Sequence, residues 1–175
     1  ARKQIAARKL IDINIFAIAN STCVYFKNDG FDENWEEVFE KPQPNSLSSI
    51  LEYAKNHHLE NLILVDNTAS SSLPNRYQEF INNGFDVVSS NKIANTLSFS
   101  FYKKLRETLK KNQKEYLYET NVGAGLPLID NIKLLHLSGE NITKIKGVFS
   151  GTLSFIFNSF SVKNLSFSEV LKEAI

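Results

Sequence analysis

Several apolar runs in this chain end in short polar segments whose side chains could bind a ligand. A lysine in such a place can hold a phosphate, a nicotinamide or a carboxylate as a point charge, and amide or hydroxyl groups there can hydrogen-bond a cofactor. The structural alternatives are an ordinary surface lysine and a polar cluster that caps the following helix. The residues concerned are Asn67, Thr68 and Ser70, which follow the run 61–65, and Lys92, which follows the run 85–88.

Glu119 lies just before a glycine-rich turn that spans residues 121–127. A carboxylate beside small residues, whose main-chain carbonyls can converge, suits a hard monovalent or divalent cation, because such ions prefer oxygen ligands. In the structural alternative, the turn holds itself and Glu119 is salt-bridged or solvated. The turn is a poor dinucleotide fingerprint, because position 128 is Leu where G-x-G-x-x-G has its third glycine, and Pro127 interrupts it.

The segment Ser150-Gly151-Thr152 has no His or Asp nearby and does not form a nucleophile elbow. Its glycine and hydroxyls could instead let a small polar substrate approach the backbone closely. The histidines give no zinc-type cluster, because His57 and His58 are adjacent on a predicted helix and cannot share a face, and His136 stands alone.

Short apolar segments alternate with helical patterns over the first 120 residues. This alternation, with short connections, is typical of a parallel sheet whose strands are joined by helices, and the run 61–65 is continuous enough for a strand covered on both faces. We therefore predict an α/β fold with an incomplete, doubly wound parallel sheet. Ligands of such sheets lie outside the carboxyl ends of the strands, where the polar segments occur. The expected strands are 13–19, 61–65, 85–88 and 115–119, and the expected helices are 1–10, 46–57, 75–83 and 96–112.

The pattern changes near residue 121, where we expect a second domain to begin. Its segments predict α+β character, and the last of them opens with a capping box of Ser166 and Glu169. We therefore divide the chain into a partial sheet domain, 1–120, and the start of an α+β domain, 121–175. Helical patterns are cut short at both ends, so we expect the central piece of a longer protein. The expected elements of the second part are a helix over 128–137 and a strand over 142–149.

The composition excludes several classes of protein. The net charge is +1 and both signs are mixed along the 175 residues, which argues against partners such as nucleic acids or a membrane surface. The single cysteine excludes an internal disulfide and fits a reducing compartment. No apolar run reaches transmembrane length and no signal peptide opens the chain. We therefore expect a cytoplasmic protein.

Four blocks of sequence, taken in their order and spacing, resemble the homoserine dehydrogenase family. The resemblance extends over essentially the whole chain, and the last two blocks are the most specific. The length of the segment between Ala19 and Ile63, with Asn34-Trp35, is similar to the dehydrogenase half of bifunctional aspartokinase–homoserine dehydrogenases. The four blocks are VDNTAS at 65–70, VVSSNKIAN at 87–95, YETNVGAGLP at 118–127 and GVFSGTLSFIF at 147–157.

This resemblance implies an enzyme that interconverts L-homoserine and L-aspartate 4-semialdehyde with NAD or NADP, a step in threonine and methionine biosynthesis. It implies that the first domain is a Rossmann-like NAD(P)-binding domain and that the second is a catalytic and dimerisation domain, so we expect a homo-oligomer. It also assigns roles to residues. The cofactor contacts would be Thr68 and Lys92, with Ser70 a further candidate. A sodium ion would be held by Glu119 and the main-chain oxygens of Val122, Ala124 and Leu126. Gly151 and Thr152 would line the homoserine pocket.

The chain also departs from the family's pattern. The glycine-rich cofactor loop is expected upstream of Ala1, and the catalytic lysine with its acidic neighbours is expected downstream of Ile175. Position 90 is Ser where the family commonly has Pro. One alternative is a regulatory or interaction domain that keeps the scaffold without the chemistry. Another is an aspartate semialdehyde dehydrogenase, but this needs a nucleophilic cysteine in a strand-to-helix turn, and Cys23 has no base nearby.

Overall fold

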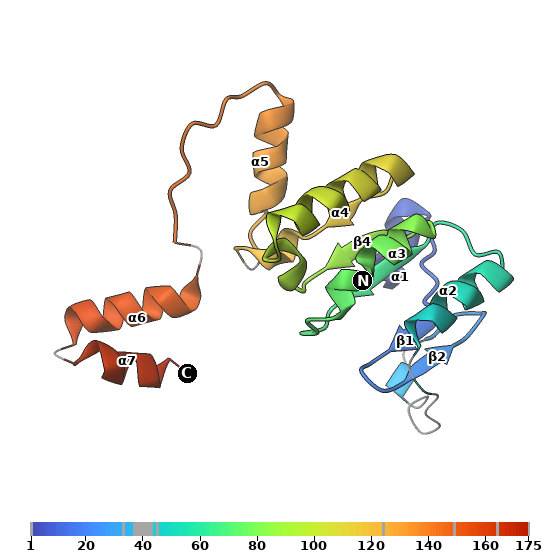
Figure 1. The fold of residues 1–175 in the computed structure, drawn as a ribbon, viewed down its shortest axis with the longest axis horizontal. Coiled ribbons are helices and arrows are strands. Elements are labelled where there is room, and N and C mark those ends of the chain that lie inside the picture. The colour runs from blue at the N-terminus through green and yellow to red at the C-terminus, as the bar shows by residue number, and fades with distance from the viewer. Residues whose placement is uncertain are drawn as a thin grey trace. The chain divides into compact units, whose positions relative to one another are not determined.

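The computed structural model describes residues 2–32, 34–36, 44, 46–123, 125–148, 150–163 and 165–174. The chain forms two compact units, residues 1–62 and 63–175, each described below by itself (Figure 1). The elements are α1 (Arg2–Lys9), β1 (Ala17–Ala19), β2 (Val24–Phe26), α2 (Leu47–Asn56), β3 (Ile63–Asp66), η2 (Leu73–Arg76), α3 (Tyr77–Asn82), β4 (Asp86–Ser89), η3 (Ile93–Asn95), α4 (Phe99–Asn112), β5 (Tyr116–Leu117), η4 (Glu119–Asn121), α5 (Leu128–Leu137), α6 (Gly151–Val162) and α7 (Phe167–Glu173).

In the first unit, β1 pairs with β2 in an antiparallel two-stranded sheet. The prediction of a buried strand over 13–19 that joins the parallel sheet was therefore wrong. The physical reason lies in the turn, where the Asn20 side-chain oxygen accepts the main-chain N–H groups of Thr22 and Cys23 at 2.9 and 2.8 Å. This tight turn sends the chain straight back, and a connection this short can only join antiparallel strands.

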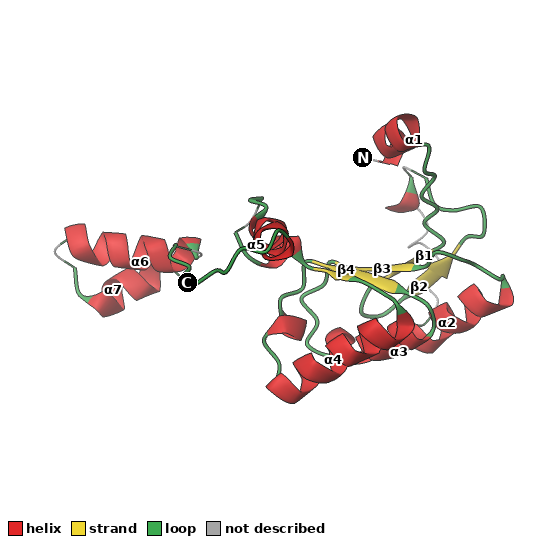
Figure 2. Ribbon diagram, turned by 90° about the horizontal axis from the view of Figure 1, so that it is seen from above, coloured by secondary structure: helices red, strands yellow, loops and turns green. Residues whose placement is uncertain are grey.

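The second unit contains a parallel sheet in the order β3-β4-β5, which confirms the predicted α/β class. Each strand pairs with the one that precedes it, with Ile63 opposite Asp86 and Val87 opposite Tyr116. The connections β3-α3-β4 and β4-α4-β5 step across the sheet in the same direction. Because such crossovers are right-handed, both helices lie on the same face, as Figure 2 shows.

The hydrophobic core lies between this sheet and the helices α3 and α4. The opposite face of the sheet remains open in the described residues, with Ile63 and Val65 exposed by 52% and 58%. The expectation of a strand covered on both faces therefore does not hold within this chain, because no crossover places a helix there. The buried residues of the core cluster are Tyr77, Ile81, Val87, Ala94, Leu105, Leu109 and Tyr116.

Local signals fix the ends of the helices that cover the sheet. α4 begins where the Ser98 hydroxyl accepts the N–H of Phe101, a standard N-cap. After α3 the chain reverses at Gly84, whose φ of +89° lies in the left-handed region that favours glycine. The end of α3 and the start of α4 fix the lengths of the two crossover connections. The carboxyl ends of β3, β4 and β5 therefore lie at the same edge of the sheet.

Beyond residue 127 the only regular elements in the described part of the chain are the helices α5, α6 and α7. The strand predicted over 142–149 was wrong for the described residues 142–148, which have no regular structure and are exposed. An extended segment needs a partner strand for its backbone groups, and none lies beside it in the described residues. α6 packs against α7 through Phe160 and Phe167, whose rings meet edge to face at 5.7 Å.

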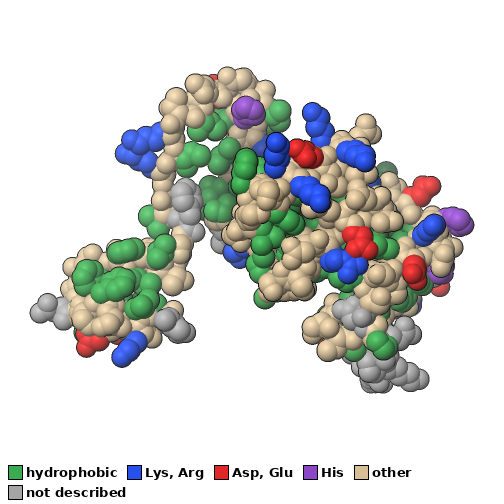
Figure 3. Space-filling view, viewed as in Figure 1, with side chains coloured by type: hydrophobic (Ala, Val, Ile, Leu, Met, Phe, Trp, Pro, Cys, Tyr) green, Lys and Arg blue, Asp and Glu red, His purple; other side chains and the backbone are tan. Residues whose placement is uncertain are grey.

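The capping box of Ser166 and Glu169 at the start of α7 is confirmed. Figure 3 shows apolar side chains on the surface of the α6–α7 pair. In α6, Phe157 is 57% exposed. Among the residues that the structure describes, no helix combines the length and the apolar character needed to cross a membrane.

Candidate functional site

A buried carboxylate, Asp66, stands at the carboxyl end of β3 and is 0% exposed. Its Oδ1 accepts both the main-chain N–H and the hydroxyl of Thr68, each at 2.8 Å. The first of these bonds is the Asx-turn with which an aspartate closes the chain two residues on. The polar segment after β3 is therefore tied directly to the end of its own strand.

The second oxygen of Asp66 reaches across to α3 and to the segment after β4. Oδ2 accepts the Tyr77 hydroxyl at 2.5 Å and the side-chain N–H of Asn91 at 3.1 Å. Burial, together with the hydrogen bond to Asp66, raises the pKa of Tyr77, so that its hydroxyl stays protonated and donates. Ser89 completes the cluster, since its oxygen lies 2.9 Å from the Tyr77 hydroxyl and accepts the Asn91 N–H at 3.0 Å.

The same edge is extended to β5 by Asn121. In the amide orientation that satisfies both of its polar atoms, Asn121 donates to the Ser89 carbonyl at 3.0 Å and accepts from the Asn95 amide at 2.9 Å. The carboxyl ends of all three parallel strands are thus cross-linked by side-chain hydrogen bonds. This is the edge at which open α/β sheets bind their ligands.

Thr68 is exposed at this edge, but most of its hydrogen-bonding capacity is already used. Its hydroxyl proton points at Asp66, and its oxygen accepts the Ser70 N–H at 3.1 Å. A threonine hydroxyl has one proton and two lone pairs. Thr68 can therefore offer an incoming molecule one acceptor lone pair and no donor.

Ser70 has little free capacity at its side chain. Its hydroxyl oxygen accepts the N–H groups of Ser72 and Leu73, both at 3.2 Å, at the start of η2. Its main-chain carbonyl accepts the Asn91 amide at 2.9 Å. In this structure Ser70 joins the segment after β3 to the segment after β4, and its predicted contact with a cofactor stays a prediction.

Lys92 follows Asn91 directly and is exposed. Its ammonium has no hydrogen-bond or ion-pair partner within the described ranges of the chain. The backbone that carries it is well fixed, because the N–H of Ile93 donates to the Asn91 side-chain oxygen at 3.0 Å. A free charge on a fixed main chain at the ligand-binding edge is the arrangement expected for a residue that contacts an anionic or polar ligand.

Ser90, at the position where the resemblance led us to expect proline, makes two bonds that a proline could not. Its N–H donates to the Asp66 carbonyl at 3.0 Å, and its hydroxyl donates to the Asn67 side-chain oxygen at 3.2 Å. A proline has neither group. The serine therefore adds a direct link between the segments after β3 and β4.

Glu119 caps the helix α5. One carboxylate oxygen accepts the N–H of Ile129 at 2.9 Å and the other accepts the N–H of Asp130 at 2.8 Å. The negative charge also lies at the positive end of the helix dipole. Between the two, Gly123 has a φ of +77°, and a Cβ there would meet Leu128 Cδ1 at 2.4 Å, so the turn requires glycine.

Of the four predicted cation ligands, Glu119, Val122 and Leu126 lie within the described residues. Ala124 is outside the described residues, whereas the carbonyl of Leu126 accepts the N–H of Leu128 at 2.9 Å. Each Glu119 oxygen accepts one hydrogen bond and retains a lone pair that could face a cation. No group of three or more His, Cys, Asp or Glu side chains suited to a metal occurs in the described part of the chain. A site here would rest on one carboxylate and main-chain oxygens.

Gly151 and Thr152 form the first turn of α6, which Ser150 caps by accepting the Leu153 N–H at 3.2 Å. Both residues are exposed, and a Cβ at Gly151 would meet no atom within 4 Å, so the backbone is open to a small molecule on that side. No hydrogen bond or ion pair between described residues joins them to Thr68 or Lys92.

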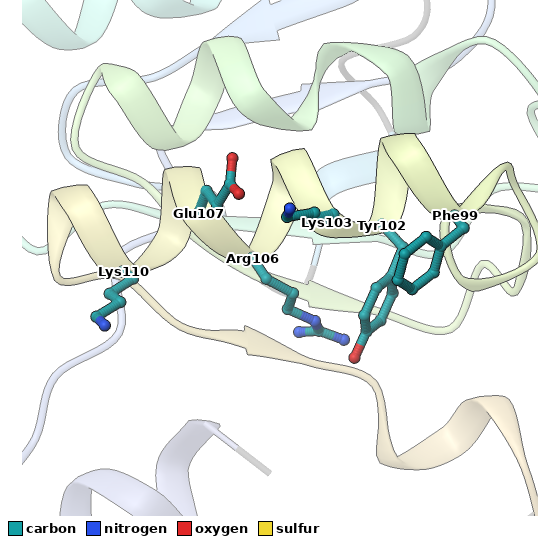
Figure 4. Close-up of a pocket in the computed structure, with 6 residues that line it drawn as sticks. All are labelled: Phe99, Tyr102, Lys103, Arg106, Glu107 and Lys110. Atoms are coloured by element: carbon teal, nitrogen blue, oxygen red, sulfur yellow. The ribbon is translucent and has the colours of Figure 1, made fainter.

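An open hollow on α4, drawn in Figure 4, contains none of the predicted site residues. It is lined from this single helix, and the Arg106 guanidinium in it lies over the Tyr102 and Tyr118 rings at 4.8 and 5.1 Å. These cation–π contacts account for an arginine that has a buried nitrogen without a hydrogen-bond partner. The hollow is therefore a packing feature of the helix surface.

Sequence patterns assign no functional role to Asp66, Tyr77 or Asn91, although Asn91 belongs to the polar segment that contains Lys92. One signal was present, since Asp66 follows a continuous apolar run directly and precedes Asn67-Thr68. An acidic residue at that place can lie inside or outside the fold. Only the pairing of β3 with β4, which places Asn91 beside it, decides that it is buried.

Family models identify the chain from both of its parts. The model described as the homoserine dehydrogenase NAD binding domain matches residues 2–119, and the model described as homoserine dehydrogenase matches residues 127–175. The chain belongs to the homoserine dehydrogenase family. A bifunctional aspartokinase/homoserine dehydrogenase of Buchnera aphidicola is 42% identical over 99% of this chain and 21% of that protein. The chain thus spans about a fifth of the length of the curated relatives it matches.

Solved structures show the same fold. A crystal structure of a Candida auris protein of unknown function has a TM-score of 0.78 and 28% identity, and covers 92% of this chain and 47% of that one. A hyperthermophilic archaeal homoserine dehydrogenase in complex with NADPH has a TM-score of 0.73 and 24% identity, over 99% of this chain and 55% of that one. The NAD-binding part of this homoserine dehydrogenase family member is therefore Rossmann-like.

Proposed function

We propose that this chain is part of a homoserine dehydrogenase that interconverts L-homoserine and L-aspartate 4-semialdehyde with NAD or NADP. The observation that carries the proposal is the cross-linked carboxyl edge of the parallel sheet, where Thr68 and Lys92 stand on neighbouring strand ends tied together through Asp66 and Asn91. The relative that is 42% identical favours the dehydrogenase part of a bifunctional aspartokinase–homoserine dehydrogenase.

The polar groups at this edge suit a nicotinamide nucleotide. Such a cofactor supplies the hydride acceptor and donor of the reaction, and carries hydroxyl and amide donors together with phosphate oxygens. Lys92 offers an unpaired positive charge, and Thr68 offers an acceptor. In this proposal Thr68 and Lys92 hold and orient the cofactor, with Ser70 contributing through its main chain.

A sodium ion at the glycine-rich turn is the second element of the proposal. Glu119 would share its carboxylate between the N-terminus of α5 and the ion, and Val122, Ala124 and Leu126 would contribute main-chain oxygens. Support comes from the chemistry of the donor set, since hard cations take carboxylate and carbonyl oxygens. The ion would join the turn to the helix that Glu119 already caps.

The remaining parts of the proposal concern the substrate and the assembly. Gly151 and Thr152 would line the homoserine pocket, which the open backbone at Gly151 supports. The cofactor domain would span residues 1–120, and residues 121–175 would begin the catalytic and dimerisation domain of a cytoplasmic homo-oligomer.

Purified complete gene product tests the proposal through homoserine-dependent reduction of NAD or NADP. Lys92→Ala should lower kcat/KM, because the activation free energy should rise by about 2–4 kcal/mol. This is the cost of losing one electrostatic contact in a catalytic site. The matched control is Lys110→Ala, which removes an exposed lysine from α4, away from the sheet edge, and should leave kcat/KM unchanged. No homoserine-dependent turnover in the wild type would contradict the function, and near-normal turnover in Lys92→Ala would make Lys92 an ordinary surface residue.

A further inference from the structure

Asp66 is a buried charge that the proposed chemistry does not use. Its carboxylate accepts four hydrogen bonds from three residues: two from Thr68, one from Tyr77 and one from Asn91. A buried ionised group is expensive, and well-packed apolar residues often replace such groups without loss of stability. Its presence here calls for an explanation other than stability of the sheet.

The geometry of the carboxylate supplies one. An ionised carboxylate only accepts hydrogen bonds, so it fixes the direction in which every neighbouring donor points. The Thr68 hydroxyl must aim its proton inward, which leaves an acceptor lone pair on the outside. The Asn91 amide must aim its N–H groups at Asp66 and at the Ser70 carbonyl, which fixes the main chain that leads into Lys92.

We propose that Asp66 is a positioning residue of the cofactor site, which acts through Thr68 and Asn91 and makes Thr68 an acceptor for a donor group of the nicotinamide nucleotide. This inference rests on the proposed cofactor contacts of Thr68 and Lys92. The donor would be a ribose hydroxyl, the carboxamide N–H or the adenine amino group, because the phosphates and the ring nitrogens of such a cofactor offer no donor at neutral pH. A phosphate oxygen would be repelled at Thr68 and would lie toward Lys92 instead.

The first experiment measures the Kd of NADPH for the complete gene product by fluorescence titration, and compares Asp66→Asn with wild type. An asparagine has the same shape, but its NH2 group must face the N–H of either Thr68 or Asn91. Loss of one correctly oriented hydrogen bond, with a polar group left unpaired, weakens binding by about tenfold, so Kd for NADPH should rise by about tenfold. kcat at saturating cofactor should change less than KM, because Asp66 does not touch the reacting atoms.

The matched control is Asp86→Asn at the opposite, amino edge of the same sheet. Asp86 also accepts a main-chain N–H, from Glu115 at 2.8 Å, and it pairs with Lys114. The Asp86 side chain is 34% exposed, so the variant tests whether loss of a carboxylate elsewhere in the same sheet alters cofactor binding. It should leave the Kd of NADPH unchanged. An equal rise of Kd in both variants would make Asp66 merely structural and would overturn the proposal.

A second pair of variants tests the route through Thr68. Thr68→Ser keeps the hydroxyl and its bond to Asp66, and should bind NADPH within about twofold of wild type. Thr68→Val keeps the shape and loses the acceptor, and should bind about as weakly as Asp66→Asn. Combining Thr68→Val with Asp66→Asn should add less than the two single effects together, since residues that act as a unit are not additive. Full additivity would contradict action through Thr68.

Asn91→Ala serves if Asp66→Asn does not fold, because it leaves the carboxylate paired with Thr68 and Tyr77. The variant loses the hydrogen bond from Asn91 to the Ser70 carbonyl and the bond from the Ile93 N–H that fixes the main chain around Lys92. The Kd of NADPH should therefore still rise severalfold. Wild-type affinity in either folded variant overturns the positioning role. Absence of binding of both NADPH and NADH by the wild type instead overturns the proposed function, so that the two failures are distinguishable.

Discussion

The parallel-sheet region, residues 63–121, and the helical region, residues 128–174, are held together by different kinds of contact. In the first, Asp66 bonds to Asn91 25 residues away, and a cluster of large side chains is fully buried. In the second, the helices are closed by local caps, and apolar residues such as Leu153 remain exposed by 53%. Contacts distant in sequence therefore define the candidate cofactor site, whereas neighbouring residues define the helices after it.

The largest expected effect is the loss of local stability when a leucine is truncated in the parallel-sheet region, compared with the same change in the helical region. Leu105→Ala in α4 empties a position that is 1% exposed, and should cost about 2–5 kcal/mol in the free energy of local opening. Leu153→Ala in α6 should cost less than about 1 kcal/mol, because little apolar surface is lost there. Amide hydrogen exchange of the complete gene product, resolved by peptide, measures both. A large cost at Leu153 would show that other parts of the protein cover α6, and would break the comparison.

The next effect concerns the buried cluster at the sheet edge. Tyr77→Phe removes one hydrogen bond to an ionised acceptor and leaves the Oδ2 atom of Asp66 with Asn91 alone. Bonds to charged groups contribute about 1.5–3 kcal/mol, so exchange in α3 and β4 should accelerate accordingly. Tyr53→Phe, in the first unit, is the control, because Tyr53 packs through its ring, 4.5 Å from the Phe26 ring. Equal acceleration of amide exchange in α3 by the two variants would contradict a stabilising hydrogen bond from Tyr77 to Asp66.

A smaller effect is expected at Glu119, which stands between the two regions. Glu119→Gln keeps one of the two bonds to the start of α5 and removes the charge from the helix N-terminus, at a cost of about 0.5–2 kcal/mol. The same variant should weaken activation by sodium, since one anionic ligand becomes neutral. Asp130→Asn removes a neighbouring exposed charge and serves as the control. Unchanged dependence of the rate on sodium would leave Glu119 as a helix cap only.

The smallest effect is expected at the capping box of α7. Hydrogen bonds from Ser166 to Glu169 lower the pKa of this exposed carboxyl. A group whose folded pKa is depressed stabilises the fold above its unfolded value of about 4.3, and this contribution disappears as the pH falls through the lowered pKa. Exchange in α7, corrected for the intrinsic rate, should therefore accelerate in acid for wild type more than for Glu169→Gln. An identical pH profile would contradict the shift.

Sequence patterns locate the carboxyl ends of the three parallel strands to within two residues, because apolar runs bounded by polar turns mark where each strand stops. Continuous apolar runs mark β3 and β4, and Gly84 marks the end of α3. The position of Lys92 at the carboxyl edge follows from the same information. What the patterns do not reveal is which polar residue lies inside. Asp66 and Asn67 are adjacent, yet one is buried and the other exposed, because only one faces the helices.

The failed predictions share a physical cause. The segment 13–19 has the composition of a buried strand, but its partner is set by the turn at Asn20, and composition does not encode a partner. The segment 142–149 has apolar residues at positions 142, 145 and 148, and the described part of it has no strand beside it. A strand is defined by a partner as well as by its own residues, so short apolar runs remain ambiguous until the pairing is known.

The strand order β3-β4-β5 has a consequence for how the chain folds as it is synthesised. β4 and β5 each pair with the strand made just before them, so each waits only for its own crossover helix, and such parallel pairing forms more slowly than a hairpin because the crossover loop must close first. The Asp66 carboxylate emerges in water and can close its Asx-turn at once with Thr68. The carboxylate becomes buried only after Asn91 has left the ribosome and β4 has paired with β3. The charge is therefore buried at the same step at which Asn91 begins to hydrogen-bond to it.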